Sequence, residues 1–251
     1  MAPIIAISNQ QRGVGKTMVT LGLAKSLADK GSSVLMIDND PQGDLTSSIV
    51  GFSHLHADTL SLYKGYAVEP DEVSKNLFII GADIGLSIVS EQGFEAIIDF
   101  RNELLKLKYD FDFIFIDSLP SLGVMHASAV AASDYLMIVV KLSPSLLKGL
   151  DDQIKSTKKS ARYFNPNLKI LGIVVNQVKN DNSYDKDIMD NLLAKYHGLV
   201  LDTILPRSTY RCENVNHGIA PYASDQARQC KMVNDEVTKL ADEIIKRLAS
   251  L

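Results

Sequence analysis

The segment IIAISNQQRGVGKTMVTLGLAKSLA, residues 4–28, contains an apolar run, a glycine-containing loop and an amphipathic stretch in direct succession. The run at residues 4–8 is apolar up to its last residue, which is typical of a strand buried on both faces. After the loop, apolar side chains recur at the spacing of one helix face: Leu21, Leu23, Ala24, Leu27 and Ala28. This order of strand, loop and helix predicts the first half of a β-α-β unit.

Similar apolar runs recur along the rest of the sequence, between longer amphipathic stretches. They are rich in Val, Ile and Phe and lie at residues 34–38, 78–81, 113–117, 135–142 and 170–176. Continuous apolarity favours a parallel sheet that helices cover on both faces. No Pro-, Gly- or Ser-rich linker divides the 251 residues. We therefore expect a single α/β domain over residues 1–251, with a mostly parallel sheet flanked by helices on both faces.

Composition favours a cytoplasmic protein without a global attraction to polyanions. Lys and Arg total 26 against 30 Asp and Glu, which gives a formal net charge of −4. Any DNA binding therefore has to come from a local basic patch. The apolar start lacks a basic leader and is too short for a signal peptide or a bilayer span. The two cysteines, Cys212 and Cys230, form no C-x-x-C pair, which fits a reducing compartment.

Residues 232–251 predict a C-terminal helix that docks on the domain. Seven apolar side chains fall on one helical face: Val233, Val237, Leu240, Ala241, Ile244, Ile245 and Leu248. A membrane anchor would also be amphipathic, but the polar face carries four acids that anionic lipid would repel: Asp235, Glu236, Asp242 and Glu243. We expect no membrane partner.

The loop after the first run has the chemistry of a nucleotide phosphate site. Gly13 and Gly15 allow the backbone to approach a phosphate closely. Lys16 supplies a positive charge for the β- and γ-phosphates, and Thr17 supplies a hydroxyl for Mg²⁺. The strict spacing G-x-x-x-x-G-K-[ST] would place glycine at position 10, where the chain has Gln10. The flanking strand and helix nevertheless support a site for ATP and Mg²⁺.

Two further apolar runs end in acidic side chains. The run at residues 34–38 ends in Asp38, with Asp40 two residues later, and the run at residues 113–117 ends in Asp117. Ligands of open α/β sheets bind at the carboxyl ends of the strands, where such acids organise Mg²⁺. A turn or helix cap explains one of Asp38 and Asp40, but not comfortably both.

These motifs together resemble the ParA/MinD family of deviant Walker A ATPases, which have a P-loop NTPase fold. The run SNQQRGVGKT, residues 8–17, is similar to the family's NQKGGVGKT. DNDPQG at residues 38–43 is similar to D-x-DPQG, and IDSLPSLG at residues 116–123 to ID-x-PPSLG. The resemblance continues through residues 146–150, 172–176 and 204–207, so it covers nearly the whole chain.

The resemblance implies a role for each matching residue. Lys16 and Thr17 would bind phosphate and Mg²⁺, and Asp117 would order the Mg²⁺ shell. Asp40 would polarise the attacking water, and Asp38 would support the site. The implied nucleotide contacts are Arg12, Gly13, Val14, Gly15, Lys16, Thr17, Met18, Lys148, Asn176 and Pro206, with Thr17, Asp117 and Asp40 around the metal. Asn176 would recognise the adenine edge, although an Asn at a strand end is equally typical of a turn.

One departure concerns the family's signature lysine, which reaches across the dimer to the partner's phosphates. Its place is taken by Gln11, followed by Arg12 in place of glycine. Arg12 substitutes, another lysine substitutes, or the cross-dimer contact is lost. We favour Lys148, because the matching segment of ParA proteins lies at the dimer interface; an ordinary solvated helix charge is the alternative. A compensating lysine there resembles the McdA subgroup, which positions carboxysomes over the nucleoid.

Basic side chains also form a stripe on one predicted helix. Lys155, Lys158, Lys159 and Arg162 are spaced at i, i+3, i+4 and i+7. Such a stripe suits DNA phosphates without base recognition, although most charged stripes are only solvated faces. Arg207 and Arg211, in a segment resembling P-R-x-x-R of ParA proteins, add basic surface.

The sequence thus leads to three hypotheses. The first is an ATPase that dimerises with ATP, binds nucleoid DNA non-specifically and positions a cargo, with a McdB-like or ParB-like adaptor stimulating hydrolysis; the cargo implied by the resemblance is the carboxysome. The second is a plasmid or chromosome partition ATPase with the same chemistry. The third is a P-loop metabolic enzyme of related fold, for which the sequence has no substrate motif.

Overall fold

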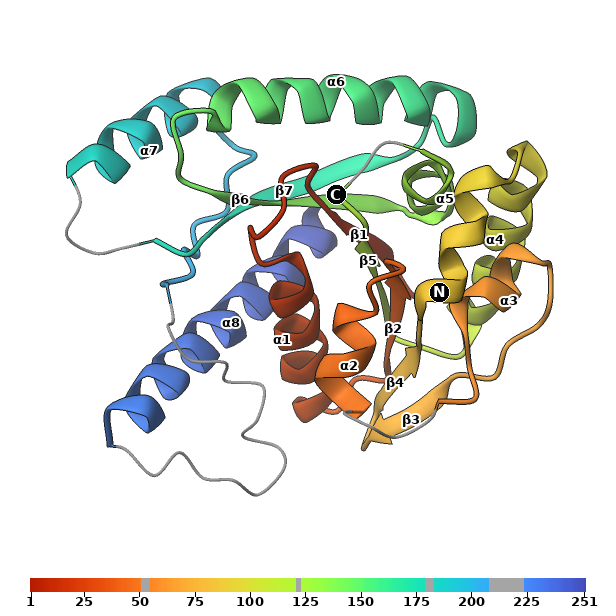
Figure 1. Ribbon diagram of the computed structural model, residues 1–251. Helices are drawn as coiled ribbons and strands as arrows, with labels where there is room; N and C mark the ends of the chain where they lie inside the picture. The colour runs from red at the N-terminus through yellow and green to blue at the C-terminus, as the bar shows by residue number, and fades with distance from the viewer. Residues whose placement is uncertain (51–54, 121–122, 179–182, 208–223) are drawn as a thin grey trace.

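The computed structural model describes residues 1–50, 55–120, 123–178, 183–207 and 224–251. Strands and helices alternate along most of the chain (Figure 1). In chain order the elements are β1 (Ile4–Ser8), α1 (Lys16–Asp29), β2 (Val34–Asn39), α2 (Asp44–Val50), α3 (Thr59–Tyr63), β3 (Asp71–Ser74), β4 (Leu77–Ile80), η1 (Ile84–Glu91), α4 (Phe94–Lys106), η2 (Leu107–Tyr109), β5 (Phe113–Ser118), α5 (Val124–Ala132), β6 (Tyr135–Lys141), α6 (Leu146–Phe164), β7 (Lys169–Asn176), α7 (Ser183–Lys195) and α8 (Ser224–Ser250).

The strands form one seven-stranded sheet in the order β3-β4-β2-β5-β1-β6-β7. All neighbouring pairs are parallel except β3 with β4, which are antiparallel. The predicted fold class, a mostly parallel sheet with helices on both faces, is confirmed. The sequence pattern missed β3 because this short edge strand alternates between half-buried and exposed side chains and therefore has no continuous apolar run.

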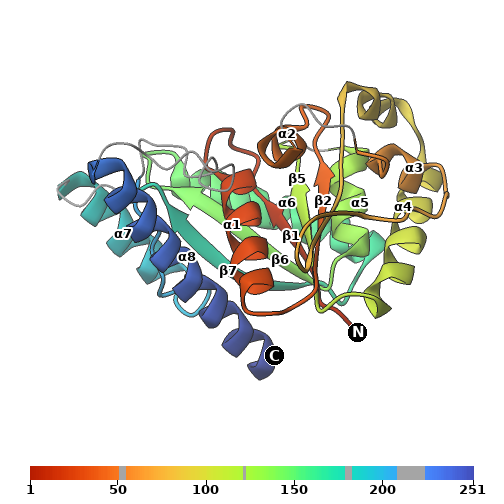
Figure 2. The same cartoon turned by 90° about the horizontal axis from the view of Figure 1, so that it is seen from below.

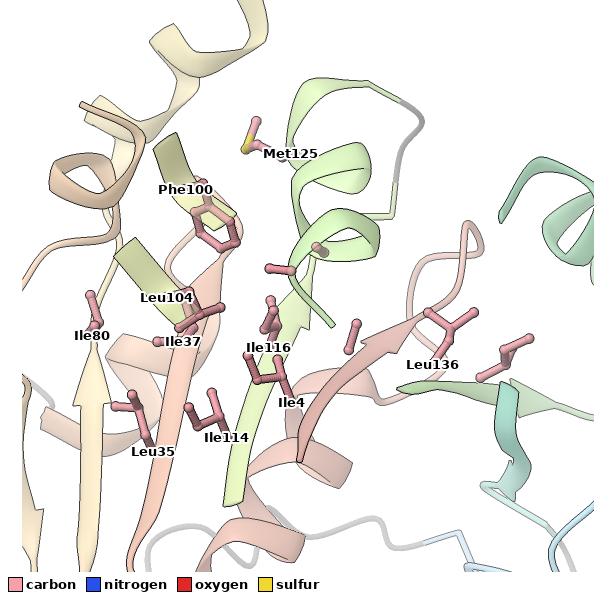
Figure 3. Close-up of a cluster of buried hydrophobic side chains, with 14 of the residues drawn as sticks. Ile4, Leu35, Ile37, Ile80, Phe100, Leu104, Ile114, Ile116, Met125 and Leu136 are labelled. Atoms are coloured by element: carbon pink, nitrogen blue, oxygen red, sulfur yellow. The ribbon is translucent and has the colours of Figure 1, made fainter. Parts of the chain in front are cut away.

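Helices cover both faces of the sheet (Figure 2), and a hydrophobic cluster lies on each face. On one face, α1 and α8 cover side chains such as Ile5, Met36 and Phe115. On the other face, α3, α4, α5 and α6 cover side chains such as Ile4, Leu35 and Ile114. We call these the α1 face and the α5 face. Figure 3 shows the core of the α5 face, with Phe100, Leu104 and Met125 above the strand side chains.

Strict alternation along β2 and β5 decides which polar side chains reach each face at the strand ends. In β2, Leu35 and Ile37 belong to the α5 face and Met36 to the α1 face. In β5, Ile114 and Ile116 belong to the α5 face and Phe115 to the α1 face. Because successive side chains of a strand point to opposite faces, Asp38 and Asp117 fall on the α1 face. The helix α1 begins at this edge of the sheet.

The C-terminal helix α8 packs against α1, in agreement with the docking helix predicted for residues 232–251, although it begins earlier, at Ser224. Val237, Leu240, Ala241 and Ile244 are buried, and Val233 and Leu248 pack against them. Packing is close, since a Cβ on Gly22 of α1 would lie 3.0 Å from a methyl group of Val237. The prediction was wrong for Ile245, which is 39% exposed. Directly following Ile244, it lies about 100° further around the helix, beyond the contact with α1.

Replacing Leu240, which is fully buried, tests the docking of α8. We expect Leu240→Ala to lower the free energy of unfolding by about 2–5 kcal/mol, because the cavity under α8 cannot close completely. Ile245→Ala is the matched control on the same helix and should cost less than about 1 kcal/mol, since its side chain already meets solvent. Urea denaturation of both variants provides the measurement, and equal losses would contradict the docking described here.

Candidate active site

The loop between β1 and α1 leaves the carboxyl end of a central strand and ends at Gly15, the residue before α1. Gly13 and Gly15 have φ angles of 70° and 93°, in the left-handed region that favours glycine. A Cβ on Gly15 would lie only 2.3 Å from Nδ2 of Asn176. The backbone at Gly15 therefore lies close to the end of β7, and its close approach to a phosphate stays a prediction.

Two side-chain amides from the end of β7 hold this loop. Nδ2 of Asn176 donates to the carbonyl of Val14 at 2.7 Å, and Nε2 of Gln177 donates to the carbonyl of Gly13 at 3.0 Å. Gln177 adopts a φ of 61°, which is uncommon for a residue other than glycine. In the structure Asn176 thus braces the loop, and its contact with adenine stays a prediction. Sequence reasoning missed Gln177, since a glutamine after a strand has no distinguishing pattern.

Helix α6 holds the start of the same loop. Oε1 of Gln153 accepts from the backbone amide of Gln10 at 2.8 Å, and Nε2 of Gln153 donates to the hydroxyl of Ser8 at 3.0 Å. Gln153 is 1% exposed and lies on the inward face of α6 with Leu146 and Leu150. Sequence reasoning missed Gln153 as well. The sequence does contain a signal: Gln153 is a polar residue at a position of α6 where the spacing from Leu146 and Leu150 predicts a buried, apolar side chain.

Lys16, Thr17 and Asp117 meet where α1 begins. The hydroxyl of Thr17 donates to Oδ2 of Asp117 at 2.6 Å, and the hydroxyl of Thr20 lies 3.5 Å from Oδ1. Burial raises the pKa of Asp117 to about 7, and the neighbouring Asp38 adds to this, while the bond from Thr17 opposes it. Burial also lowers the pKa of Lys16, against the attraction of Asp117 and Asp40. Burial therefore disfavours the charged forms of both Lys16, in the first turn of α1, and Asp117, near the end of β5.

Asp38 and Asp40 differ in how strongly they are held. Oδ2 of Asp38 accepts from the backbone amide and the hydroxyl of Thr46 at 2.9 and 2.7 Å, and Oδ1 accepts from the amide of Asp40 at 3.2 Å. Asp38 is fully buried, which raises its pKa to about 6. Asp40 is half-buried, and Oδ1 accepts from the amide of Gln42 at 2.9 Å. Asp38 is thus buried and held by three hydrogen bonds, whereas Asp40 is partly exposed and its carboxylate accepts one.

These side chains fit a Mg²⁺-nucleotide better than a metal held by protein alone. Within the described ranges, no group of three or more His, Cys, Asp or Glu could hold a metal ion. Mg²⁺ bound with a nucleotide typically takes one or two protein oxygens, with phosphates and water for the rest. The Thr17 hydroxyl with Asp117 behind it supplies such oxygens. The glycine loop and Lys16, at the start of a helix of 14 residues, suit the phosphates.

The remaining predicted nucleotide contacts lie around this loop at varying depth. Arg12 is exposed at the tip of the loop, and Met18 is 37% exposed on the first turn of α1. Pro206 pairs with Val178 in an isolated parallel bridge, which places it beside the end of β7. Lys148 is exposed in the first turn of α6, the helix that follows the carboxyl end of β6.

The predicted DNA-binding residues are placed as follows. Lys155, Lys158, Lys159 and Arg162 are exposed on α6, on the side away from the buried Leu150, Gln153 and Thr157. Arg207 is exposed, and its amide donates to the carbonyl of Val178 at 2.9 Å. Arg211 lies outside the described residues. The structure therefore presents four of these cations together on one helix.

A family model described as an AAA domain (AAA_31) matches residues 2–170. The chromosome partitioning protein ParA of Caulobacter vibrioides is 29% identical over 255 residues, which cover 97% of this chain and 94% of that protein. Among solved structures, apo McdA from Cyanothece has a TM-score of 0.82 at 20% identity, covering 99% of this chain and all of that one. Cobyrinic acid a,c-diamide synthase from Mycobacterium smegmatis, with ADP and magnesium, has a TM-score of 0.82 at 22% identity over 100% and 96% of the two chains. At these identities the two structures support the fold alone.

The raised pKa of Asp117 predicts that Asp117→Asn increases the free energy of unfolding in a pH-dependent way. The folded protein keeps this proton up to about pH 7, whereas an unfolded chain releases it near about pH 3.9. The stability that Asp117 contributes is full below the unfolded value and is lost as the pH rises through the folded value. We therefore expect the variant to match the wild type near pH 4 and to become progressively more stable than it up to pH 8.

Urea denaturation across this pH range, without nucleotide, measures the difference. Asp29→Asn is the control, because that side chain is 66% exposed and its replacement should give a nearly constant difference. A pH-independent effect of Asp117→Asn would contradict the burial of its charge.

Proposed function

Because the chain belongs to the AAA-domain family of ParA/MinD-type ATPases, which act on ATP with Mg²⁺, we propose that it is a positioning ATPase. In this proposal ATP closes a homodimer and the dimer binds DNA without sequence preference. A small adaptor protein on an intracellular cargo then stimulates hydrolysis and release. ATP hydrolysis is the activity of the family, and the dimer, DNA and adaptor are the proposed part.

The proposed roles of the site residues follow from their surroundings. Lys16 would neutralise β- and γ-phosphate charge, and Thr17 and Asp117 would hold Mg²⁺, which offsets the charge that develops on the phosphates. Asp40 would accept a hydrogen bond from the attacking water, since the residue is only half-buried. Asp38 would position the loop that carries Asp40, through its bonds to Thr46.

One observation supports the link between nucleotide and DNA: the two faces of α6 carry different groups. The inward face contributes Gln153, which is bonded to the backbone of the phosphate loop at Gln10. The outward face carries Lys155, Lys158, Lys159 and Arg162. A change at the loop therefore has one direct contact through which it can reach a basic surface. This arrangement supports ATP-dependent DNA binding by α6.

The cargo is proposed from the departures in the phosphate loop. Gln11 stands where ParA proteins have the signature lysine, and Lys148 offers a replacement. Because this replacement resembles the McdA subgroup, we propose that the cargo is the carboxysome. Plasmid or chromosome partition is the second candidate, favoured by the relative of Caulobacter vibrioides, which is named as a chromosome partitioning protein. Neighbouring genes separate the two: carboxysome genes favour the first, and a gene for a centromere-binding protein favours the second.

The proposed location is the cytoplasm, at the nucleoid. Over the residues that the structure describes, no helix has the length and apolarity needed to cross a membrane. The acids Asp235, Glu236, Asp242 and Glu243 lie on α8 outside its buried stripe, so the charge argument against an anionic membrane surface applies to this helix.

The proposed DNA surface predicts a change in salt dependence. Replacing Lys155, Lys158, Lys159 and Arg162 together by Gln should weaken ATP-dependent binding to two unrelated duplexes equally. The slope of log K against log salt should fall by roughly 3–4, if each cation contacts one phosphate. Fluorescence anisotropy at several salt concentrations provides the measurement. The control replaces four exposed lysines elsewhere: Lys64, Lys75, Lys239 and Lys246. Unchanged affinity in the α6 variant would place the DNA surface elsewhere.

The cation proposed to contact the partner's nucleotide is either Lys148 or Arg12. Charges count for more in a closed, water-poor interface than at a surface, so losing the correct cation should prevent dimer closure. We expect Lys148→Ala to keep ATP binding but to lose ATP-dependent dimerisation in light scattering, while Arg12→Ala is milder. A Lys148→Ala protein that dimerises normally, beside an Arg12→Ala protein that does not, would reverse the assignment.

A further inference from the structure

A second polar layer lies behind the carboxylates, one residue further along the same two strands. Asn39 follows Asp38 in β2 and Ser118 follows Asp117 in β5, and the two pairs are in register. By alternation, Asn39 and Ser118 point to the α5 face, opposite the carboxylates. They are 0% and 1% exposed. None of the steps described above uses them.

The side-chain amide of Asn39 joins the end of β2 to two helices. Nδ2 donates to the carbonyl of Met125 in the first turn of α5 at 3.0 Å. Oδ1 accepts from the hydroxyl of Tyr63, the last residue of α3, at 2.8 Å. Met125 and Phe100, which belong to the helices covering this face, are seen above the strands in Figure 3. One side chain therefore fixes β2, α3 and α5 relative to one another.

The position of Tyr63 is itself strongly determined. Its ring stacks on Phe100 of α4 with centroids 4.6 Å apart, and the residue is 2% exposed. Burial raises the pKa of Tyr63 above its usual value, so the hydroxyl remains a donor. The same hydroxyl interacts with Ser128 of α5. A fixed donor on one side and a backbone carbonyl on the other leave the Asn39 amide a single orientation that satisfies both.

This amide bears on the geometry of Asp40, the next residue. The contacts of Asp40 itself are local, with its amide bonded to Asp38 and its carboxylate bonded to the amide of Gln42. At the start of the loop between β2 and α2, Asp38 bonds to Thr46 of α2, and Asn39 bonds to α3 and α5 on the α5 face. The helix that Asn39 holds, α5, comes soon after Asp117 in the chain. Asn39 therefore connects the backbone next to Asp40 to α5, the helix that follows Asp117 in the chain.

We propose that Asn39 is a positioning residue for ATP hydrolysis, which holds the backbone of Asp40 in place relative to Asp117 through Tyr63 and Met125. The proposal rests on the role of Asp40 given above. Small displacements of a group that orients the attacking water slow the chemical step much more than they weaken nucleotide binding. Asn39 should therefore affect the hydrolysis rate while leaving ATP affinity nearly unchanged.

The test measures the single-turnover rate of ATP hydrolysis and the dissociation constant for ATP in the same variants. We expect Asn39→Leu to slow hydrolysis by about 10- to 100-fold while keeping ATP affinity within about threefold of the wild type. Tyr63→Phe should cause a smaller loss of rate, since the bond to Met125 remains. Ser118→Ala is the matched control: it is equally buried, lies beside Asn39 and has a hydroxyl without a hydrogen-bond partner among the described residues, so it should retain the wild-type rate.

Two further comparisons separate the possible failures. If Asn39 acts through Asp40, the double variant Asn39→Leu with Asp40→Ala should hydrolyse no more slowly than Asp40→Ala alone. Wild-type hydrolysis in Asp40→Ala would reject the role of Asp40 itself, whatever Asn39 does. Slow hydrolysis in Asp40→Ala beside wild-type rates in Asn39→Leu would overturn the present inference alone, as would parallel losses of rate and affinity. Should Asn39→Leu fail to fold, a wild-type rate in Tyr63→Phe overturns it.

Discussion

The parallel register of β2 with β5 is the constraint on which the site depends. It sets Asp38 beside Asp117 at the carboxyl edge of the sheet and on the same face. On that face α1 begins, and the 2.6 Å bond from Thr17 to Asp117 joins the first turn of the helix to the strand end. A slip of one residue in either strand would turn its acid to the opposite face, away from α1. The apolar side chains of both strands prevent such a slip, since it would expose each of them to the wrong packing layer.

The same register places like charges side by side in a buried region. Burial raises the pKa of both Asp38 and Asp117, and Asp38 contributes to the shift at Asp117. Lys16 is the buried cation among them within the described chain, and burial acts against its charge as well. Such a site is costly for the protein by itself and is compensated when a divalent cation and phosphates share it. A buried cluster of charged groups that lowers stability is expected where a sequence serves binding as well as folding.

The sequence predicted those features that depend on local pattern. The six buried strands, the glycine loop and the acids at strand ends all follow from apolar runs and their punctuation, and the structure contains them. The edge strand β3 was missed because its alternation is short and polar. Gln153 and Gln177 were missed for a different reason: they contact the loop from positions more than 140 residues away in the chain, and a single glutamine has no periodicity. Asn39 received no role from the sequence, because the motif was interpreted through its acids, Asp38 and Asp40. The contacts of Asn39 with Tyr63 and Met125 exist only in the packed fold. Tertiary contacts made by single polar residues are thus what one sequence cannot supply.

The departures of the phosphate loop gain a physical meaning from α6. Position 10 carries glutamine where the strict G-x-x-x-x-G-K-[ST] spacing has glycine, and its backbone amide donates a hydrogen bond to Gln153 of α6. Position 11 carries glutamine rather than the signature lysine, and Lys148, the proposed substitute, lies in the first turn of the same helix. If Lys148 contacts the partner's nucleotide, then that contact, the bond to the loop and the basic stripe all belong to one helix of 19 residues. The backbone of Lys148 belongs to the same helix as the basic stripe, whereas a lysine at position 11 would belong to the phosphate loop. Transferring the cross-dimer cation to α6 would therefore make closure of the dimer and placement of the basic stripe a single mechanical event.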